Sequence, residues 1–304
     1  MVSGPQTRLL STSHGTNRDA FSVSDWGVFV SLVLIWGASF LFIAIGLDHF
    51  HPGVVTLLRV GFGAGTLALI PRARRTRVDR SDWPRVAVLG LIWIAVPLTL
   101  FPIAQQWIDS AVAGMLNGAM PIFTAAVSAA LLKELPGTRQ TVGLLIGFAG
   151  AAAISIPSAG GGTTAVVGVI LVLAATLCYA IATNIVTPLQ QRYGSLPILA
   201  RVQWVAAGLV VPYGLVGLPE SEFAWSSLWA TAAVGVLGTG LAFVLMGTLT
   251  GRVGATRASF ITYCIPVVAL ILGVVFRNET VAPLAIAGVV AVIAGAFLAS
   301  RREV

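Results

Sequence analysis

Ten apolar runs, each about as long as a bilayer-spanning helix, divide this chain and constrain its fold more than any other feature. They lie at about residues 27–47, 53–71, 84–104, 109–132, 140–157, 164–187, 196–217, 226–248, 254–276 and 281–300. A helix needs roughly 20 apolar residues to cross a membrane. With 57% hydrophobic and 10% charged residues, the chain has too few charges to cover a water-facing surface. We therefore expect an all-α membrane protein with ten transmembrane helices.

One sequence block occurs twice at a constant offset of 145 residues. It reads Pro-apolar-Glu-apolar-Gly, with Pro121, Glu134, Gly143 and Gly150 in one copy and Pro266, Glu279, Gly288 and Gly295 in the other. Because five helices per half is an odd number, the second half would enter the membrane from the opposite side. This predicts a five-plus-five inverted repeat, a construction common in secondary transporters. We expect a disordered cytoplasmic tail at 1–24, repeats at 25–157 and 164–300, and a glycine-rich linker at 158–163.

Arginine and lysine gather in every second gap between the apolar runs. Six arginines lie between Arg72 and Arg85, whereas the alternate gaps hold almost none, with Arg277 as the exception. Because positively charged loops remain in the cytoplasm, both termini should be cytoplasmic. The basic residues are not interleaved with aromatic ones, so the net charge of +7 indicates membrane orientation and not nucleic-acid binding. The expected partners are the inner-membrane bilayer and a small-molecule substrate, and we expect a monomer.

The ten helices, the duplicated block and Trp36-Gly37 early in the first run are typical of one family. In these features the chain resembles EamA-type members of the drug/metabolite transporter superfamily. Within it, bacterial amino-acid and aromatic-metabolite exporters of the YddG type are the nearest resemblance. The resemblance implies a substrate cavity enclosed by the third, fourth, eighth and ninth helices with parts of the first and sixth. The second copy has Cys178-Tyr179-Ala180 in place of Trp36-Gly37, so the repeat symmetry is relaxed there.

Apart from one arginine, the candidate cavity residues have aromatic, thioether or neutral polar side chains. They are Trp36, Ser39, Arg59, Trp93, Thr99, Phe101, Met115, Asn117, Tyr179, Thr183, Asn184, Phe243, Met246, Ser259 and Tyr263, with Met120 and Thr262 as further members. A pocket of this kind suits a small, partly apolar, neutral or zwitterionic solute. A sugar phosphate or nucleotide would need several cations. For each single residue, ordinary helix packing is at least as good an interpretation.

Arg59 is the charge that most needs an explanation. It lies about a third of the way into the second helix, where burial costs on the order of 2.5–3.5 kcal/mol. We expect it to contact carbonyls, Asp48 or Asp109, and Arg201 occupies the roughly equivalent place in the seventh helix. Either Arg59 anchors its helix, or it binds a carboxylate or acts in gating. The middle of every run lacks a carboxylate, which counts against a cation exporter built around a buried acidic group.

The duplicated prolines and glutamates also have two interpretations each. Pro121 and Pro266 are expected in mid-helix, where proline removes a backbone hydrogen bond. They could be static kinks or hinges. Glu134 and Glu279, at helix ends, could cap a helix or pair with a neighbouring arginine, or they could act as gates. Gly143 and Gly147, four residues apart in the fifth run, predict a close contact with another helix.

These patterns favour a secondary-active transporter with alternating access, without cofactor or metal, that exports amino acids, including aromatic ones, or related small metabolites. A multidrug or cation exporter of the same superfamily and a membrane channel are the alternatives. An enzyme is disfavoured because a nucleophile in the membrane needs a histidine base within reach. The three histidines lie in the tail and in one loop, at His14, His49 and His51.

Overall fold

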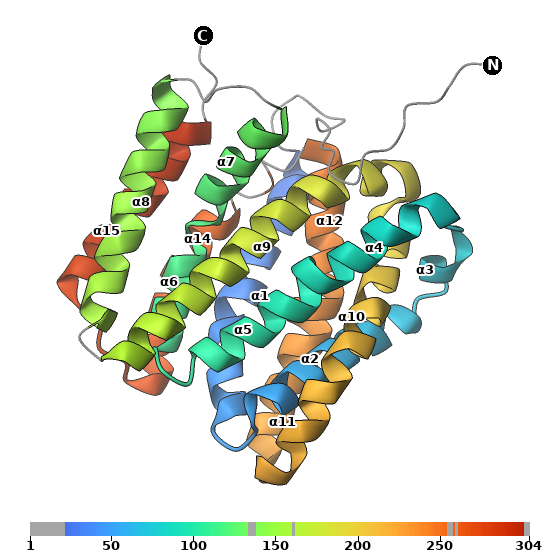
Figure 1. The fold of residues 1–304 in the computed structure, drawn as a ribbon, viewed down its shortest axis with the longest axis horizontal. Coiled ribbons are helices and arrows are strands. Elements are labelled where there is room, and N and C mark those ends of the chain that lie inside the picture. The colour runs from blue at the N-terminus through green and yellow to red at the C-terminus, as the bar shows by residue number, and fades with distance from the viewer. Residues whose placement is uncertain (1–21, 133–137, 160–161, 254–257, 259–260, 301–304) are drawn as a thin grey trace.

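The computed structural model describes residues 22–132, 138–159, 162–253, 258 and 261–300, and these form helices and connections without a strand. In the first half the helices are α1 (Val23–Leu47), α2 (Pro52–Ala68), α3 (Arg72–Arg75), η1 (Arg80–Asp82), α4 (Trp83–Leu89), η2 (Gly90–Ala95), α5 (Val96–Ala104), α6 (Ser110–Asn117), α7 (Met120–Leu132) and α8 (Thr138–Ala159). In the second half they are α9 (Thr163–Tyr193), α10 (Ser195–Gly217), η3 (Leu218–Glu220), α11 (Trp225–Ala233), η4 (Val234–Leu241), α12 (Ala242–Val253), α14 (Ile261–Arg277) and α15 (Pro283–Ser300). Figure 1 shows them packed as one bundle.

Six of these helical stretches are long and apolar enough to cross a membrane. They are Val23–Leu47, Arg80–Ala104, Ser110–Leu131, Thr163–Tyr193, Ser195–Glu220 and Trp225–Arg252. Shorter apolar helices cover Pro52–Ala68, Thr141–Ile154, Cys264–Arg277 and Pro283–Gly295. The expected tail lies outside the described residues except for its last three positions, where α1 begins. Helices α8 and α9 occupy part of the expected linker, so the glycine-rich connection is shorter than the sequence indicated.

Local sequence explains how individual helices begin. The Ser22 hydroxyl accepts a hydrogen bond from the Asp25 N–H at 3.2 Å, and the Asp25 carboxylate accepts one from the Ser22 N–H at 3.0 Å. This reciprocal pair caps the first turn of α1. Helix α2 begins with Pro52, which has no N–H to leave unpaired, and His51 Nδ1 accepts a hydrogen bond from the Gly53 N–H at 3.0 Å.

Pro121 lies near the middle of the Ser110–Leu131 stretch, as expected, but it is not inside a continuous α-helix, because a two-residue break divides that stretch into α6 and α7. Helix α6 ends at Asn117, and Pro121 is the second residue of α7. A proline at this position costs little, since the first N–H groups of a helix have no partner within the helix. Pro266, its counterpart, does lie inside α14, and a Cβ on Gly118 would fall 2.6 Å from the Pro266 Cγ. Pro266 of α14 therefore packs against the break between α6 and α7.

Helices from the two halves contact each other through small residues. A Cβ on Gly150 would fall 2.7 Å from the Gly288 carbonyl oxygen, and a Cβ on Gly288 would fall 2.6 Å from the Gly150 carbonyl oxygen. Gly295 approaches Gly143 and Gly147 in the same way. Because residue numbers rise on α8 as they fall on α15, the two helices are antiparallel, and they lie side by side in Figure 1. The close contact that Gly143 and Gly147 predicted is confirmed.

A second local feature recurs at the offset of the repeat. The π-helical turn η2 interrupts the Arg80–Ala104 stretch, and the π-helical turn η4 interrupts the Trp225–Arg252 stretch. When 145 is added to the residue numbers of η2, 90–95, the result lies within η4, at 234–241. Such turns often mark functional sites.

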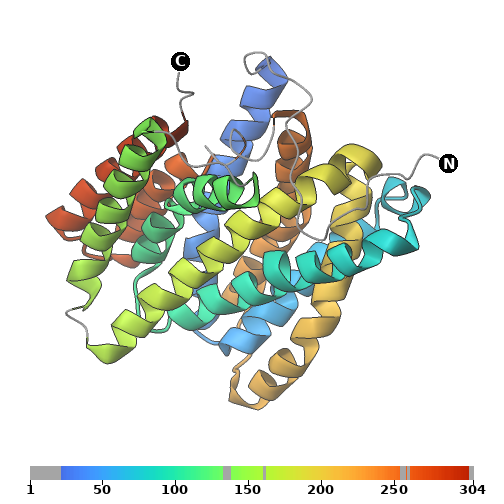
Figure 2. The ribbon, with the colours of Figure 1, turned by 45° about the horizontal axis from the view of Figure 1, so that its top comes forward.

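Figure 2 shows that α1 begins and α15 ends at the same end of the molecule.

Candidate functional site

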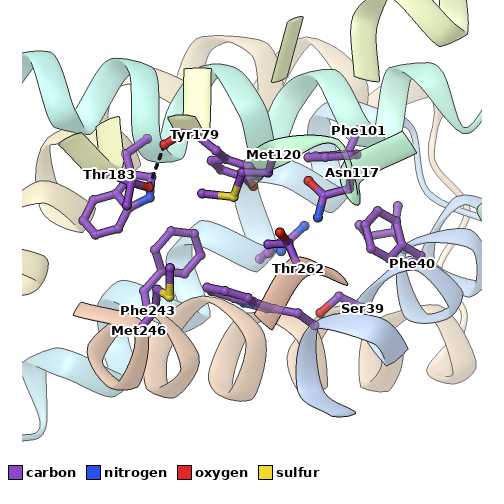
Figure 3. Close-up of a pocket in the computed structure, with 14 residues that line it drawn as sticks. Ser39, Phe40, Phe101, Asn117, Met120, Tyr179, Thr183, Phe243, Met246 and Thr262 are labelled. Atoms are coloured by element: carbon purple, nitrogen blue, oxygen red, sulfur yellow. Dashed lines mark hydrogen bonds between the residues drawn. The ribbon is translucent and has the colours of Figure 1, made fainter. Parts of the chain in front are cut away.

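A cavity lies where α1, α2, η2 and α5 to α7 meet α9, α12 and α14. Its lining residues are Trp36, Ser39, Phe40, Ile43, Arg59, Trp93, Phe101, Asn117, Met120, Tyr179, Thr183, Phe243, Met246 and Thr262. Figure 3 shows Thr183, Phe243 and Met246 at one end and Ser39, Phe40 and Asn117 at the other. The cavity has a volume of about 50 Å³. A metabolite would therefore have to widen it.

Aromatic rings form the framework of the cavity. The ring centroid of Phe243 lies 5.5 Å from Trp36, 5.4 Å from Trp93 and 6.5 Å from Tyr179. Tyr179 stacks on Phe101 at 5.9 Å. Trp36 and Tyr179 pack against both apolar clusters of the protein, so the cavity lies at the boundary between them. Edge-to-face and stacked pairs of this kind fix ring orientation beyond simple burial.

Arg59 supplies the only cationic side chain among the described lining residues, and its side chain is 4% exposed. Its Nε donates a hydrogen bond to the Thr239 hydroxyl oxygen at 2.9 Å, and that hydroxyl donates to the Val234 carbonyl at 3.2 Å. Gln203 Nε2 donates to the Thr239 carbonyl. A network from α2 through η4 to α10 thus holds the guanidinium at the cavity wall.

The partners expected for Arg59 were wrong. Asp48 forms a two-bond ion pair with Arg277, at 2.8 and 2.9 Å. Within the described ranges no carboxylate lies within ion-pair distance of Arg59. Asp109 sits by α6, where burial and the nearby charge of Glu279 raise the pKa of its carboxyl. The sequence could not indicate Thr239, because the contact joins residues 180 positions apart.

The other polar groups of the cavity are neutral. Asn117 Oδ1 is buried and has no hydrogen-bond partner among the described residues. The Ser39 and Thr183 hydroxyls donate to carbonyls of their own helices, at 2.9 and 2.7 Å. Trp36 Nε1 donates to the Gly238 carbonyl at 2.9 Å, which ties α1 to η4. A buried, unpaired acceptor is costly unless a ligand or water completes it.

The structure brings most of the predicted cavity residues together, with exceptions. Thr99 donates to the Ala95 carbonyl, Met115 is fully buried in the apolar core, and the Asn184 amide donates to the Ala180 and Thr124 carbonyls. None of these three lines the cavity, because each points toward its own or a neighbouring helix. Ser259 and Glu134 lie outside the described residues, as does the side chain of Tyr263.

Two lining residues were missed. Phe40 and Ile43 line the cavity from α1. The signal was present, since positions 36, 39, 40 and 43 follow the helical spacing of three and four residues from Trp36. Arg201, in contrast, donates to the Pro197 and Thr76 carbonyls at 2.7 and 2.5 Å and does not line the cavity. Arg201 therefore serves as an anchor, one of the two roles considered for Arg59.

Glu279 caps a helix from the other half of the protein. Its carboxylate accepts hydrogen bonds from the Ser110 N–H at 3.1 Å, the Ser110 hydroxyl at 2.6 Å and the Ala111 N–H at 2.9 Å. A carboxylate at a helix N-terminus accepts hydrogen bonds from free N–H groups and interacts favourably with the positive end of the helix dipole. This cap fastens the connection after α14 onto the start of α6.

Replacing Glu279 with Ala should therefore destabilise the fold by about 1–2 kcal/mol, since the first N–H groups of α6 lose their acceptor. The temperature of thermal unfolding in detergent should fall. Glu222→Ala, at an exposed carboxylate, is the matched control and should leave that temperature nearly unchanged. Equal unfolding temperatures for the two variants would argue against the cap.

Replacing Thr239 with Val removes the oxygen that receives the Arg59 Nε–H and changes the side-chain shape little. If Arg59 contacts the substrate, its misplacement should raise the KM for transport about tenfold, equivalent to about 1.4 kcal/mol. Thr248→Val is the control, because the Thr248 hydroxyl donates only to the Val244 carbonyl of its own helix, at 2.8 Å. A KM unchanged in both variants would contradict the combined claim that Thr239 positions Arg59 and that Arg59 contacts the substrate.

The fold and its cavity define a helical integral membrane protein, and comparison with known proteins gives its family. Residues 26–156 and 166–301 each match the EamA-like transporter family. The chain belongs to the EamA-like transporter family, and it is an integral membrane transporter.

Named relatives extend over nearly the whole chain. A probable terminal-alkyne amino-acid exporter of Streptantibioticus cattleyicolor is 27% identical over 285 residues, which cover 92% of this chain and 94% of that protein. A probable amino-acid metabolite efflux pump of Salmonella typhimurium is 24% identical, covering 88% and 91%. A crystal structure with a TM-score of 0.67 and 19% identity covers 92% of this chain and 97% of its own, which shows a likeness of fold.

Proposed function

We propose that this protein is a secondary-active carrier that exports amino acids, including aromatic ones, or related small zwitterionic metabolites across the inner membrane. The observation that carries the proposal is a buried guanidinium with no carboxylate partner among the described residues, at the wall of an aromatic cavity. A charge buried without a counterion is costly. A substrate carboxylate would supply the counterion, and the aromatic rings would contact the apolar side chain.

The substrate ammonium group has a matching acceptor in Asn117. Its Oδ1 lies in the same cavity as Arg59 and lacks a partner in the described structure. The faces of Trp36 and Tyr179 add attraction for a cation. A zwitterion would supply a counterion to Arg59 and a hydrogen-bond donor to Asn117 Oδ1 at once, whereas a cationic drug would be repelled by Arg59. The names of the two exporter relatives agree with this substrate class.

A ten-span, five-plus-five inverted repeat would provide the alternating access. Three observations support it: the family matches the chain twice, the π-helical turns recur at the repeat offset, and α8 and α15 meet in a reciprocal antiparallel contact. The four shorter apolar helices complete the ten crossings in this proposal, and the basic gaps support an orientation with both termini in the cytoplasm.

Ion pairs at both ends of α1 fit a closed state of such a carrier. At its start Asp25 pairs with Arg252 of α12 at 3.3 Å, and just past its end Asp48 pairs with Arg277 of α14. In the proposed cycle, opening to either side separates one of these pairs. The Asp48–Arg277 pair is partly exposed, so its separation costs little. The Asp25 side chain is only 3% exposed and, among the described residues, keeps just its Ser22 hydrogen bonds when Arg252 leaves, so opening at that end costs more.

An exit route is suggested beyond the Asp48 end of α1. A polar hollow of about 530 Å³ there is lined by residues that include Ala44, Asp48, Gln105 and Arg277. Ile43 lines the cavity and the next residue, Ala44, lines the hollow. Phe101 of α5 lines the cavity, and Gln105, just past the end of α5, lines the hollow. The two spaces are therefore bordered by adjacent residues of α1 and by residues about one turn apart at the end of α5.

Counterflow in proteoliposomes tests the proposal. Vesicles loaded with unlabelled phenylalanine, leucine or alanine should accumulate the labelled amino acid in a saturable way that unlabelled competitors reduce. Exchange of a cationic dye without exchange of any amino acid would contradict the substrate class. Flux that rises without saturation would indicate a channel.

A further inference from the structure

A second pocket lies on the side of the bundle, away from the central cavity. It is formed by the end of α2, by α3 and by α10, and these elements lie together at the right of Figure 1. Its lining residues are Leu67, Ala68, Ala73, Arg74, Ala200, Arg201 and Trp204. The pocket measures about 390 Å³ and shares no lining residue with the cavity. Its chemistry is therefore independent of the proposed substrate site.

Two guanidinium groups are held in place at this pocket by neutral partners. Arg201 donates to the Pro197 carbonyl at 2.7 Å, the Thr76 carbonyl at 2.5 Å and the Ala73 carbonyl at 3.3 Å. Arg74 donates to the Ala68 carbonyl at 2.6 Å. Carbonyls fix the positions of these groups but leave their charges unneutralised. Because a guanidinium has five N–H donors, both arginines retain donors for an anion.

The surrounding segment has an excess of positive charge. Arg72, Arg77 and Arg80 are exposed, and the neighbouring acids are engaged elsewhere. Asp79 pairs with Arg192 at 2.6 Å, and Asp82 pairs with Arg192 at 3.0 Å and with Arg85 at 3.7 Å. In the described part of the chain no carboxylate lies within ion-pair distance of Arg74 or Arg201. The pocket thus combines two fixed cations with a local field that attracts anions.

The remaining lining is apolar, and in the orientation proposed above it would lie near the boundary between headgroups and hydrocarbon. Arg201 is six residues beyond the start of α10 at Ser195, or about 9 Å along the helix. Trp204, almost one turn deeper, is 57% exposed on the side of the bundle. Tryptophan is enriched at this depth in membrane proteins. A soluble anion would gain nothing from Trp204 and the alanines, whereas a lipid would contact both parts.

We infer that this pocket binds the phosphate of an anionic phospholipid from the cytoplasmic leaflet. Arg74 and Arg201 contact the phosphate, and an acyl chain lies along Trp204. Basic pockets between membrane helices on the cytoplasmic side are suited to such headgroups. The choice of leaflet rests on the orientation proposed above, but binding of the headgroup does not depend on the transported substrate.

Native mass spectrometry of the purified full-length protein in detergent tests this inference. Wild-type protein titrated with phosphatidylglycerol should bind one lipid at least tenfold more tightly than it binds phosphatidylcholine of the same acyl chains. The double variant Arg74→Gln/Arg201→Gln should lose this preference. The matched control Arg72→Gln/Arg77→Gln removes the same charge from the same segment, away from the pocket lining, and should retain affinity within about twofold.

Several results would overturn the inference. An equal loss in both double variants would indicate diffuse surface charge in place of a site. Equal binding of the two lipids by wild-type protein would exclude headgroup recognition, and full competition by soluble glycerol 3-phosphate would indicate a free-anion site. If the double variant does not fold, Arg74→Gln alone serves, because Arg74 is exposed and makes one carbonyl contact. Unchanged lipid preference in that variant would count against the site.

Discussion

Replacing Arg59 with Gln is expected to reduce affinity for a carboxylate-bearing substrate on the order of 100-fold, with no loss of stability. A hydrogen bond to a charged group contributes about 1.5–3 kcal/mol, and the upper end of that range corresponds to roughly this factor. The fold itself should not suffer, because removing a buried charge that lacks a counterion relieves its desolvation cost. The measurements are the KM for counterflow and the temperature of thermal unfolding in detergent.

Arg85→Gln is the matched control for this prediction. Arg85 is 5% exposed, close to the 4% of Arg59, but it pairs with Asp82 at 3.7 Å. Losing Arg85 should lower the unfolding temperature modestly, because Asp82 keeps its pair with Arg192 at 3.0 Å, and should leave the KM unchanged. The reverse result for Arg59, a lower unfolding temperature with an unchanged KM, would make Arg59 a structural anchor and remove the basis for carboxylate binding.

Replacing Gly150 with Leu should strongly destabilise the contact between the two halves. A Cβ there would fall 2.7 Å from both the Gly288 carbonyl oxygen and the Val292 backbone nitrogen. Backbone atoms cannot move aside as a flexible side chain can, so α8 and α15 must separate. Overpacking typically costs about 1–3 kcal/mol, and we expect this substitution to reach or exceed the upper value.

Gly208→Leu provides a control of the same chemical change. Gly208 also lies within a helix, but a Cβ added to it meets nothing within 4 Å. Helix propensity alone should make this variant as stable as the wild type or slightly more so. The two variants can be compared by thermal unfolding and by the fraction of monodisperse protein after purification. Similar behaviour of both would mean that the α8–α15 contact contributes little to the fold.

The large-scale features of this fold could be predicted because they depend on the local composition of the sequence. Runs of about 20 apolar residues indicate membrane helices whatever their neighbours are. The glycines at 143 and 147 predicted a close helix contact, since only small residues let backbones approach. Trp36, Tyr179 and Phe243 could be placed at the cavity because large aromatic and polar residues stand out on otherwise small, aliphatic helices.

Features that depend on contacts between distant residues could not be predicted. The partner of Arg59 is on η4, in the other half of the chain, and its hydroxyl is available because a π-helical turn presents Thr239 there. The break before Pro121 lies against Pro266, another contact between residues far apart in the sequence. Thr99 and Met115 have the same residue types as true lining residues, and only the rotation of their helices, set by tertiary packing, excludes them.

Competition for counterflow in the wild-type protein tests the central claim most directly. Phenylalanine and phenylethylamine share the aromatic ring and the ammonium group, and only phenylalanine has the carboxylate that Arg59 would bind. Unlabelled phenylalanine should inhibit uptake of a labelled amino acid at least tenfold more strongly than phenylethylamine does. Inhibition by the amine that equals or exceeds that of phenylalanine would contradict the account.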